Sequence, residues 1–509
     1  TGACKALLAS LVGKPVLYVA KDILTAERIA TLTEEFSGVK CTVLYPKDDV
    51  LLYKKAFSRY SLYKRIKSLK EIKDGAKIVF TDYSALAQPF PEKLDEITFK
   101  TGEERDLNAD AEKLSELGYT RLDYVSGEGT FSLRGDILDV FPVGCENPYR
   151  MDYFGDEIET IKEFDAQTRE KLSVVNSVTV ISATDVKTEE DEIPYVCKRL
   201  DEEIAKITDA ETLAGARTFI AELKEKIALK DFGALSFVLP LLRSMTDNPF
   251  SFINPDSVVI YDEAKFVMSS ADAVEKEHAE RLKSLIAEGN AFGFSRGQIS
   301  GKEKVFSYLK NKTQVAFQTF ATVIPFFDPL KTFTLKVGAT ARYQLKLDNL
   351  FTDVRNWSHG GYDVIVYAGN ETRKNDLAEE LAERGITENV TLLSDSLEEG
   401  VILHDEKLAV IGSGDIYSKK TGKKAIRKSQ EFFSAPEVGD YAVHETHGVG
   451  KVIGTKRIST TEGTKDYLAL EYAGGDVLYV PVEQMDVLTR YLGGDKEPKL
   501  SKIGGTEFA

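Results

Sequence analysis

The first 36 residues, TGACKALLASLVGKPVLYVAKDILTAERIATLTEEF (1–36), decide the class of fold. Within them KALLASLVG is an apolar segment with helical spacing, KPVLYVA is a short run typical of a buried strand, and DILTAERIATLTEEF has helical spacing again, with Asp22 as a suitable N-cap. Two more apolar runs, CTVLYP (41–46) and AKIVFTDYSAL (76–86), predict further strands. Helices that alternate with buried strands are typical of a mostly parallel sheet, so we expect an α/β domain over residues 1–105.

The same stretch resembles the end of a phosphate-binding loop. In the pattern G-x-x-x-x-G-K-[ST], glycine lets the backbone approach phosphate, the lysine reaches the β- and γ-phosphates, and the hydroxyl holds Mg²⁺. Lys5 is present and Gly2 lies within the loop, but Cys4 stands where the second glycine belongs and Ala6 where the hydroxyl belongs, and the pattern's first glycine would fall before residue 1. The alternative is that Lys5 is an ordinary exposed lysine at the start of a helix.

An acidic pair near the middle of the chain fits the second half of a nucleotide site. VVIYDEAK (258–265) is an apolar strand that ends in Asp262 and Glu263, where such sites carry a metal-linked aspartate and a catalytic glutamate. An acidic strand end without a partner is the alternative. Together with Lys5, the pair favours a nucleotide-binding fold that has lost its nucleotide.

The composition limits the possible classes of protein. A chain of 509 residues suggests three or four domains of about 100–200 residues each. With 66 basic and 82 acidic residues the net charge is −16, which argues against a chain that wraps nucleic acid as a whole. No apolar stretch of about 18 residues predicts a membrane span. The scattered cysteines favour a reducing, cytoplasmic setting; they are Cys4, Cys41, Cys145 and Cys197.

Changes in pattern divide the rest of the chain. The predicted segments are a β-rich domain (106–185), a mainly helical continuation of the first domain with one clear strand (186–340), a small α/β domain (341–430), a compact β-rich unit (437–494) and a terminal segment (495–509). KKTGKKAIRKSQ (419–430) is interpreted as a solvated linker, with a DNA-binding patch as the alternative. His444 and His447 have the spacing H-x-x-H without an acidic or cysteine companion, so we predict no metal site.

Two stretches carry a resemblance to known families. GEGTFSLRGDILDVFPVGCENPYRMDYFGDEIETIKEFDAQT (127–168) resembles domain 2 of the excision-repair protein UvrB and of the transcription-repair coupling factors. The segment that begins VGDYAVHETHGVGKVIGTKRIST (438–460) resembles the RNA-polymerase-interacting domain that coupling factors share with CarD-type regulators. Residues 45–72 also resemble the first domain of the coupling factors. Only the coupling factors carry both domains in this order.

This resemblance implies an adaptor. The C-terminal unit would bind the β subunit of bacterial RNA polymerase, and domain 2 would recruit UvrA for transcription-coupled excision repair. The family keeps its ATPase, with ATP and Mg²⁺, in a later translocase motor that acts on double-stranded DNA. We expect the present chain to be the N-terminal portion without that motor, with a degenerate P-loop-like module, no catalytic residue, no cofactor and no contact with a membrane.

The resemblance also points to residues on domain 2. If NPYRMDYFGDE is a strand, its alternation predicts three residues on the core face: Tyr149, Met151 and Tyr153. Arg150, Asp152 and Phe154 would share the other face, and Arg134 could lie alongside if its strand pairs with this one. In the family the positions of Arg134, Arg150 and Phe154 belong to the UvrA-binding surface. The alternative places Phe154 in a second core and the arginines in surface ion pairs.

The C-terminal unit contains a hairpin pattern. YLALEYAGGDVLYVPVEQMDVL (467–488) alternates apolar and polar residues on both sides of a glycine turn, and the length of the unit fits a small SH3- or Tudor-like barrel. By the resemblance, Ile458 occupies an apolar contact position for polymerase, with Lys456 and Arg457 beside it. The alternative is that Ile458 points into the interior of its strand.

Two other functions remain open. The first is a UvrB-like ATPase with an unusual loop, although the aromatic DNA-clamping hairpin of UvrB has no counterpart in ALAQPFPEKLDEITFKTGEERDL (85–107). The second is a transcription regulator of the CarD type without a role in repair. ATP turnover would distinguish the first from the adaptor, and UvrA binding would distinguish the second.

Overall fold

The protein is represented by a computed structural model. It describes residues 1–47, 59–186, 188, 191–320, 323–324, 326–343, 346–417, 441–444, 448–460, 463–473, 476–481, 488–490 and 500. The chain divides into two compact units, residues 1–418 and residues 419–509, and each is described by itself. Among the helices that these residues form, none is long and apolar enough to span a membrane.

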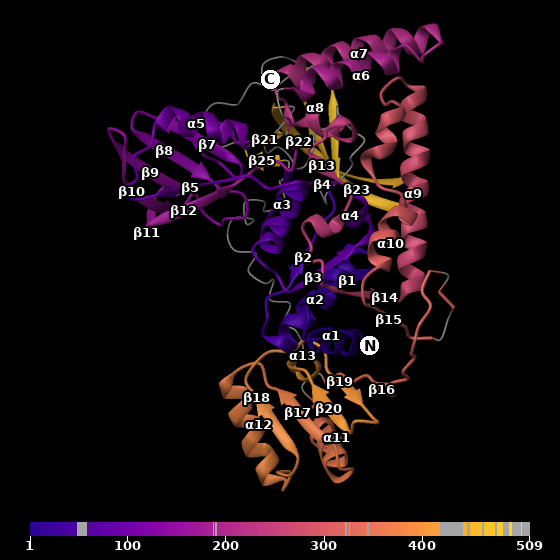
Figure 1. The fold of residues 1–509 in the computed structure, drawn as a ribbon. Helices are drawn as coiled ribbons and strands as arrows, with labels where there is room; N and C mark the ends of the chain where they lie inside the picture. Colours follow the sequence, from indigo (N-terminus) through magenta and orange to yellow (C-terminus); the bar gives the residue numbers. More distant parts are fainter. Residues whose placement is uncertain are drawn as a thin grey trace. The chain divides into compact units, whose positions relative to one another are not determined.

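A five-stranded parallel sheet lies at the centre of the first unit (Figure 1). The strand order is β15-β14-β1-β3-β2, and each neighbouring pair is parallel. The strands are β1 (Val16–Ala20), β2 (Thr42–Val43), β3 (Ile78–Asp82), β14 (Val258–Asp262) and β15 (Gln314–Phe317). The mixed α/β class predicted from the first residues is therefore confirmed.

Two details of this sheet differ from the predictions. Strand β15 was not predicted, because it is a four-residue edge strand whose side chains are only half-buried. The predicted strand over 76–86 ends at Asp82, whose carboxylate accepts a hydrogen bond from the main-chain N–H of Ala85 at 2.9 Å. This bond caps the short helix α4 (Tyr83–Ala87), so the last residues of the segment are helical.

Helices cover both faces of the parallel sheet. They are α1 (Gly2–Ser10), α2 (Ile23–Ser37), α3 (Arg59–Lys73), α9 (Ala264–Ala287) and α10 (Lys302–Lys310). Asp22 caps α2 as predicted, because its Oδ1 accepts from the N–H of Thr25 at 2.7 Å. All five residues of β1 are buried, and alternate ones belong to two different apolar clusters, as expected of a strand covered on both sides.

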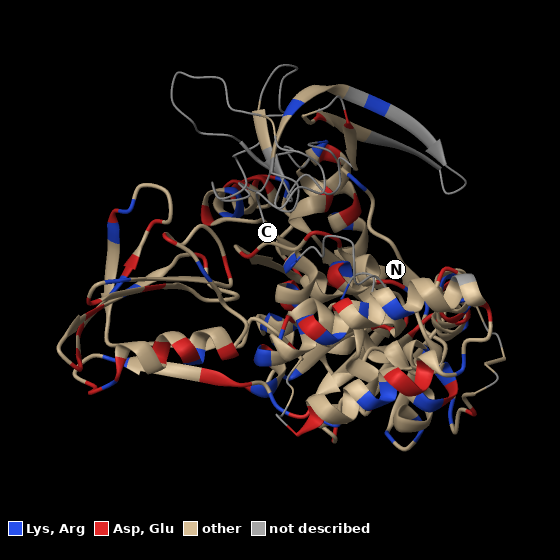
Figure 2. Cartoon of the chain, turned by 90° about the horizontal axis from the view of Figure 1, so that it is seen from above, with Lys and Arg blue, Asp and Glu red and all other residues tan. Residues whose placement is uncertain are grey.

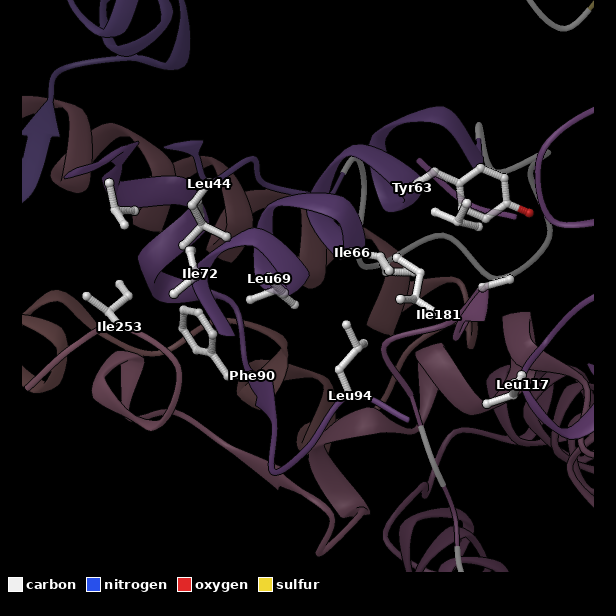
Figure 3. Close-up of a cluster of buried hydrophobic side chains, with 14 of the residues drawn as sticks. Leu44, Tyr63, Ile66, Leu69, Ile72, Phe90, Leu94, Leu117, Ile181 and Ile253 are labelled. Carbon is white, nitrogen blue, oxygen red and sulfur yellow. The ribbon is translucent and has the colours of Figure 1, made fainter. Parts of the chain in front are cut away.

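The larger of these clusters joins the sheet to the β-rich region that follows it. Figure 3 shows part of it, with residues of α3 packed against Phe90 and Leu94. Leu117 and Ile181, from the β-rich region, belong to the same cluster. Because one continuous apolar cluster spans both regions, the two regions share a core and pack against each other.

The β-rich region is a six-stranded sheet of order β11-β10-β9-β8-β7-β6. Its strands are β6 (Thr120–Arg121), β7 (Thr130–Arg134), β8 (Ile137–Phe141), β9 (Tyr149–Phe154), β10 (Glu157–Phe164) and β11 (Lys171–Val175). Helix α5 (Leu107–Glu116) precedes it. The chain enters and leaves through an antiparallel pair, β5 (Glu96–Lys100) and β12 (Ser177–Ile181), so strand pairing begins before residue 106.

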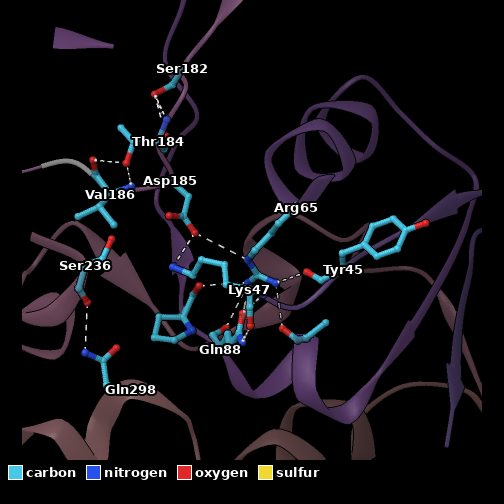
Figure 4. A network of polar contacts seen from close by, with 12 residues as sticks. Tyr45, Lys47, Arg65, Gln88, Ser182, Thr184, Asp185, Val186, Ser236 and Gln298 are labelled. Atoms are coloured by element: carbon cyan, nitrogen blue, oxygen red, sulfur yellow. Dashed lines mark hydrogen bonds and ion pairs between the residues drawn. The ribbon is translucent and has the colours of Figure 1, made fainter. Parts of the chain in front are cut away.

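A buried ionic network lies where the chain returns to the first domain (Figure 4). Asp185 Oδ2 is 2.9 Å from Lys47 Nζ and 3.8 Å from Arg65 Nε, and the side chains of Asp185 and Arg65 are wholly buried. The guanidinium of Arg65 also donates to four main-chain carbonyls, those of Tyr45, Ala85, Gln88 and Pro89. One side chain of α3 therefore ties together two separate stretches of backbone, at residue 45 and at residues 85–89.

The rest of the first unit is helical and then α/β. Helices α6 (Glu192–Ile204), α7 (Ala210–Ala228) and α8 (Phe232–Phe237) share their own apolar cluster. A mixed sheet of order β16-β19-β20-β17-β18 follows. Its elements are β16 (Val337–Gly338), α11 (Leu347–His359), β17 (Asp363–Tyr367), α12 (Glu371–Glu383), β18 (Val390–Leu393), β19 (Val401–Leu403), β20 (Leu408–Ile411) and α13 (Ser413–Ile416).

The second unit contains a five-stranded antiparallel sheet of order β24-β23-β22-β21-β25. The strands are β21 (Tyr441–His444), β22 (Gly448–Thr460), β23 (Gly463–Glu471), β24 (Val477–Pro481) and β25 (Leu488–Arg490). The predicted hairpin is confirmed, with Leu468 opposite Val480 and Leu470 opposite Leu478. No pairing among the described residues closes this sheet, and the barrel stays a prediction.

Candidate functional site

A buried carboxylate organises the exposed face of the six-stranded sheet. Asp139, on β8, has a fully buried side chain, and its two oxygens accept hydrogen bonds from Arg150 Nε and Nη2 at 2.7 and 2.8 Å. Arg134 Nη2 donates to Asp139 Oδ2 at 2.7 Å. The arginine side chains keep 36% (Arg134) and 29% (Arg150) of their surface exposed, so each guanidinium is anchored at one edge and open at the other.

The two arginines meet in a way that the sequence did not predict. Their strands β7 and β9 do not pair, because β8 lies between them. Asp139 lies directly opposite Arg150 in the register, and Arg134 reaches the same carboxylate from the other side. The missed residue is Asp139, and its signal was a lone acid inside the apolar run ILDVF, which needs a cationic partner if the run is buried.

Phe154 lies on the same strand as Arg150 and is 80% exposed. Met151 and Tyr153 are buried, as the alternation predicted, while Tyr149 is half-buried. The alternative in which Phe154 fills a second core is therefore wrong. A large apolar side chain left in water on a strand that also carries a partly exposed arginine is the composition of a protein-binding surface.

The structure also brings together the residues of the candidate nucleotide site. Lys5 Nζ donates to Asp262 Oδ1 at 2.5 Å and to Glu263 Oε1 at 2.9 Å, although the partners are more than 250 residues apart in the chain. Glu263 stands at the start of α9 with φ 52°, and it also accepts from the main-chain N–H and the hydroxyl of Thr319. The one lysine of the loop is thus paired with both acids.

The other residues of the loop belong to the core. Helix α1 already begins at Gly2, and Thr1 caps it by accepting from the N–H of Cys4 at 3.2 Å. Cys4 and Ala6 are 5% and 0% exposed and lie in the apolar cluster under the sheet. Burial raises the pKa of the Cys4 thiol, which keeps it protonated near neutral pH.

Opposing influences act on the charges of this site. Burial lowers the pKa of Lys5, but its hydrogen bonds to Asp262 and Glu263 outweigh burial and raise that pKa above its usual value. Burial raises the pKa of Glu263, but hydrogen bonds from Thr319 and Lys5 outweigh it, so that pKa lies below its ordinary value. Lys5 and Glu263 therefore both favour their charged forms within this ion-paired group.

In the second unit the structure describes part of the predicted polymerase-binding group. Lys456 is exposed, and its ammonium lies 5.3 Å from the centre of the Tyr479 ring on β24. Tyr479 is itself 40% exposed. The side chains of Arg457 and Ile458 lie outside the described residues, so the prediction about Ile458 stays open.

Acidic and basic side chains alternate over the described elements of the chain. Figure 2 shows Lys and Arg interspersed with Asp and Glu rather than gathered on one element. The arginines of the six-stranded sheet thus matter through their local arrangement and not as part of a general basic surface.

Comparison with known families matches two separate parts of the chain. Residues 97–185 match the UvrB interaction domain family, and residues 437–492 match the CarD-like/TRCF RID domain family. The first match contains Arg134, Asp139, Arg150 and Phe154, and the second contains Lys456.

Comparison with curated proteins extends the likeness to nearly the whole chain. A transcription-repair-coupling factor of Bacillus subtilis is 24% identical over 533 residues, and that of Staphylococcus epidermidis is 28% identical over 536 residues. The chain is similar to transcription-repair-coupling factors over nearly its whole length. The alignments cover 98% and 97% of the chain but only 45% and 44% of those relatives, so the chain spans less than half the length of the coupling factors it matches.

Proposed function

We propose that this chain is the adaptor portion of a transcription-repair coupling factor. Its C-terminal unit binds the β subunit of stalled RNA polymerase, and the six-stranded sheet recruits UvrA for excision repair in the cytoplasm. The full-length protein would add an ATP-driven motor that translocates on double-stranded DNA and displaces the polymerase.

The observation that carries the proposal is the arrangement around Asp139. A fully buried acid holds Arg134 and Arg150 at the surface of one sheet, and Phe154 is left 80% exposed on the same strand as Arg150. Arginine beside an exposed aromatic is the usual composition of an energetic centre in a protein interface. This surface lies within the part of the chain that matches the UvrB interaction domain.

Binding of the intact chain to two purified partners tests this function. We expect it to bind UvrA and RNA polymerase independently and to join them in one complex. Arg150→Glu should weaken UvrA binding by about 2 kcal/mol, roughly 30-fold, and leave polymerase binding unchanged. The exposed Lys283→Glu is the matched control, since it reverses a charge on α9, outside the six-stranded sheet. Polymerase binding without any UvrA binding would favour a CarD-type regulator instead.

We further propose that the phosphate-binding loop is idle. Three features support this: Lys5 is neutralised by Asp262 and Glu263, Ala6 has no hydroxyl for a metal, and Cys4 is packed into the core. A triphosphate would have to displace two carboxylates from the one lysine that should receive it.

Calorimetry with Mg-ATP separates the adaptor from the ATPase. The intact chain should show neither micromolar affinity nor turnover. The double variant Asp262→Asn with Glu263→Gln should be measured beside the unaltered chain. It removes both carboxylates that pair with Lys5 but does not restore the missing glycine and hydroxyl. Micromolar binding by the unaltered chain would favour the UvrB-like ATPase.

A further inference from the structure

A third arginine joins Arg134 and Arg150 through two aromatic side chains. The guanidinium carbon of Arg134 is 4.5 Å from the centre of the Tyr124 ring, and that of Arg169 is 5.1 Å from the same ring. Arg169 is also 5.9 Å from the ring of Phe164, over which Arg150 lies at 5.1 Å. Asp139 closes the group between Arg134 and Arg150. We call these six residues the arginine–aromatic cluster.

The cluster carries more positive than negative charge. Three guanidinium groups face one carboxylate, and that carboxylate is already satisfied by Arg134 and Arg150. Lys162, opposite Arg150 in the register, is paired with Asp152 at 2.5 Å and does not alter this balance. Among the described residues, no carboxylate forms an ion pair with Arg169. Its side chain is exposed, and Tyr124 beside it is 56% exposed.

The turn between β10 and β11 holds Arg169 in place. Arg169 has φ 62°, a left-handed conformation that is unfavourable for residues other than glycine and asparagine. Its N–H donates to the carbonyl of Asp165 at 2.9 Å, and Asp165 Oδ1 accepts from the N–H groups of Gln167 and Thr168, each at 2.8 Å. The bonded turn fixes the backbone of Arg169. Its guanidinium donates to the carbonyl of Val125 at 3.5 Å and lies over the two rings, so these contacts hold its position before a partner binds.

We propose that Arg169 and Tyr124 extend the UvrA-docking surface and that the cluster receives an acidic segment of that partner, with a carboxylate on the guanidinium of Arg169. The inference rests on the function proposed above. The argument for an acidic partner is charge complementarity, because the three arginines and one aspartate of the cluster leave an excess of two positive charges. Arg169, which has no ion-pair partner among the described residues, presents an exposed planar guanidinium over two rings. Such a group suits bidentate recognition of a carboxylate.

Affinity measurements with the intact chain and purified UvrA test the proposal. Arg169→Glu should bind about tenfold more weakly, and Arg169→Lys about threefold, because lysine keeps the charge but cannot stack as a plane on Tyr124. Arg169→Gln should also lower the salt dependence of binding, since one ionic contact is removed. Arg169→Gly tests whether weaker binding results from misfolding, because glycine adopts φ 62° without strain. This variant should keep the melting temperature of the unaltered chain and still bind UvrA more weakly.

The outcomes distinguish this inference from the proposed function on which it rests. If the unaltered chain does not bind UvrA, the proposed function fails. If it binds, and Arg150→Glu weakens binding while Arg169→Glu and Lys283→Glu both match the unaltered chain, the function stands and the inference is overturned. Binding of a short DNA duplex that depends on Arg169, with UvrA binding unaffected, would also overturn it, because the cluster would then be a nucleic-acid site.

Discussion

Asp139 and Arg150 face each other on neighbouring antiparallel strands, and both carboxylate oxygens of Asp139 accept hydrogen bonds from the guanidinium of Arg150. Asp139 is wholly buried, whereas Arg150 is partly exposed. The acid is thus a fixed internal anchor and the arginine is the part that a partner can reach. Hydrogen bonding to Asp139 raises the pKa of Arg150 above its already high value, so the exposed edge is permanently cationic.

Asp139→Ala should therefore weaken UvrA binding although Asp139 itself touches no partner. The change leaves Arg134 and Arg150 without their shared acceptor. Because both keep a route to water, we expect a loss of about 2 kcal/mol in the stability of the sheet, below the full cost of an uncompensated buried charge. Hydrogen exchange of the β8 and β9 amides measures it. Asp136→Asn, at the exposed turn before β8, is the control and should change neither exchange nor binding.

Phe154→Ala should separate binding from stability. Because the ring is 80% exposed, its removal should change the unfolding free energy by no more than about 0.5 kcal/mol. Removal of an aromatic anchor from an interface should cost about 2 kcal/mol of UvrA affinity. Leu229→Ala removes another large exposed apolar side chain, outside the sheet, and should leave affinity unchanged. A marked fall in melting temperature for Phe154→Ala would mean that the ring packs within the chain.

The buried network around Arg65 predicts a large effect at Asp185. Burial lowers the pKa of Arg65 to about 10, the nearby Asp185 charge opposes that shift, and the arginine stays charged at neutral pH. Asp185→Asn would leave that buried charge without its counter-ion, and we expect a cost of about 3 kcal/mol. Urea unfolding of the intact chain checks this value. Asp191→Asn, where the side chain is exposed and does not cap α6, should differ little from the unaltered chain.

The sequence allowed the elements to be predicted better than their partners. Strand β9 was predicted from alternation, which is local, and burial of Met151 and Tyr153 bears it out. Asp139 was not predicted as a site residue because its role depends on which strand lies between β7 and β9. Arg169 was not predicted as a site residue because no local sequence pattern indicates a positive φ at a residue other than glycine. Lys5 and Asp262 could be considered together only because a nucleotide-site pattern joins distant residues, and a pattern does not say that the lysine is already ion-paired.

The ion-paired loop gives stability a defined dependence on pH. The pKa of Glu263 in the folded chain lies below its ordinary value of 4.5, so the unfolded chain binds the proton more tightly. The stabilisation from Glu263 is therefore complete above the unfolded pKa and disappears as the pH falls through the folded one. The difference in unfolding free energy between the unaltered chain and Glu263→Gln should shrink between about pH 6 and about pH 3. The matched control is Glu277→Gln, at an exposed position of α9. A Glu263→Gln difference that does not change with pH would mean that Lys5 and Thr319 do not hold this carboxylate in its charged form.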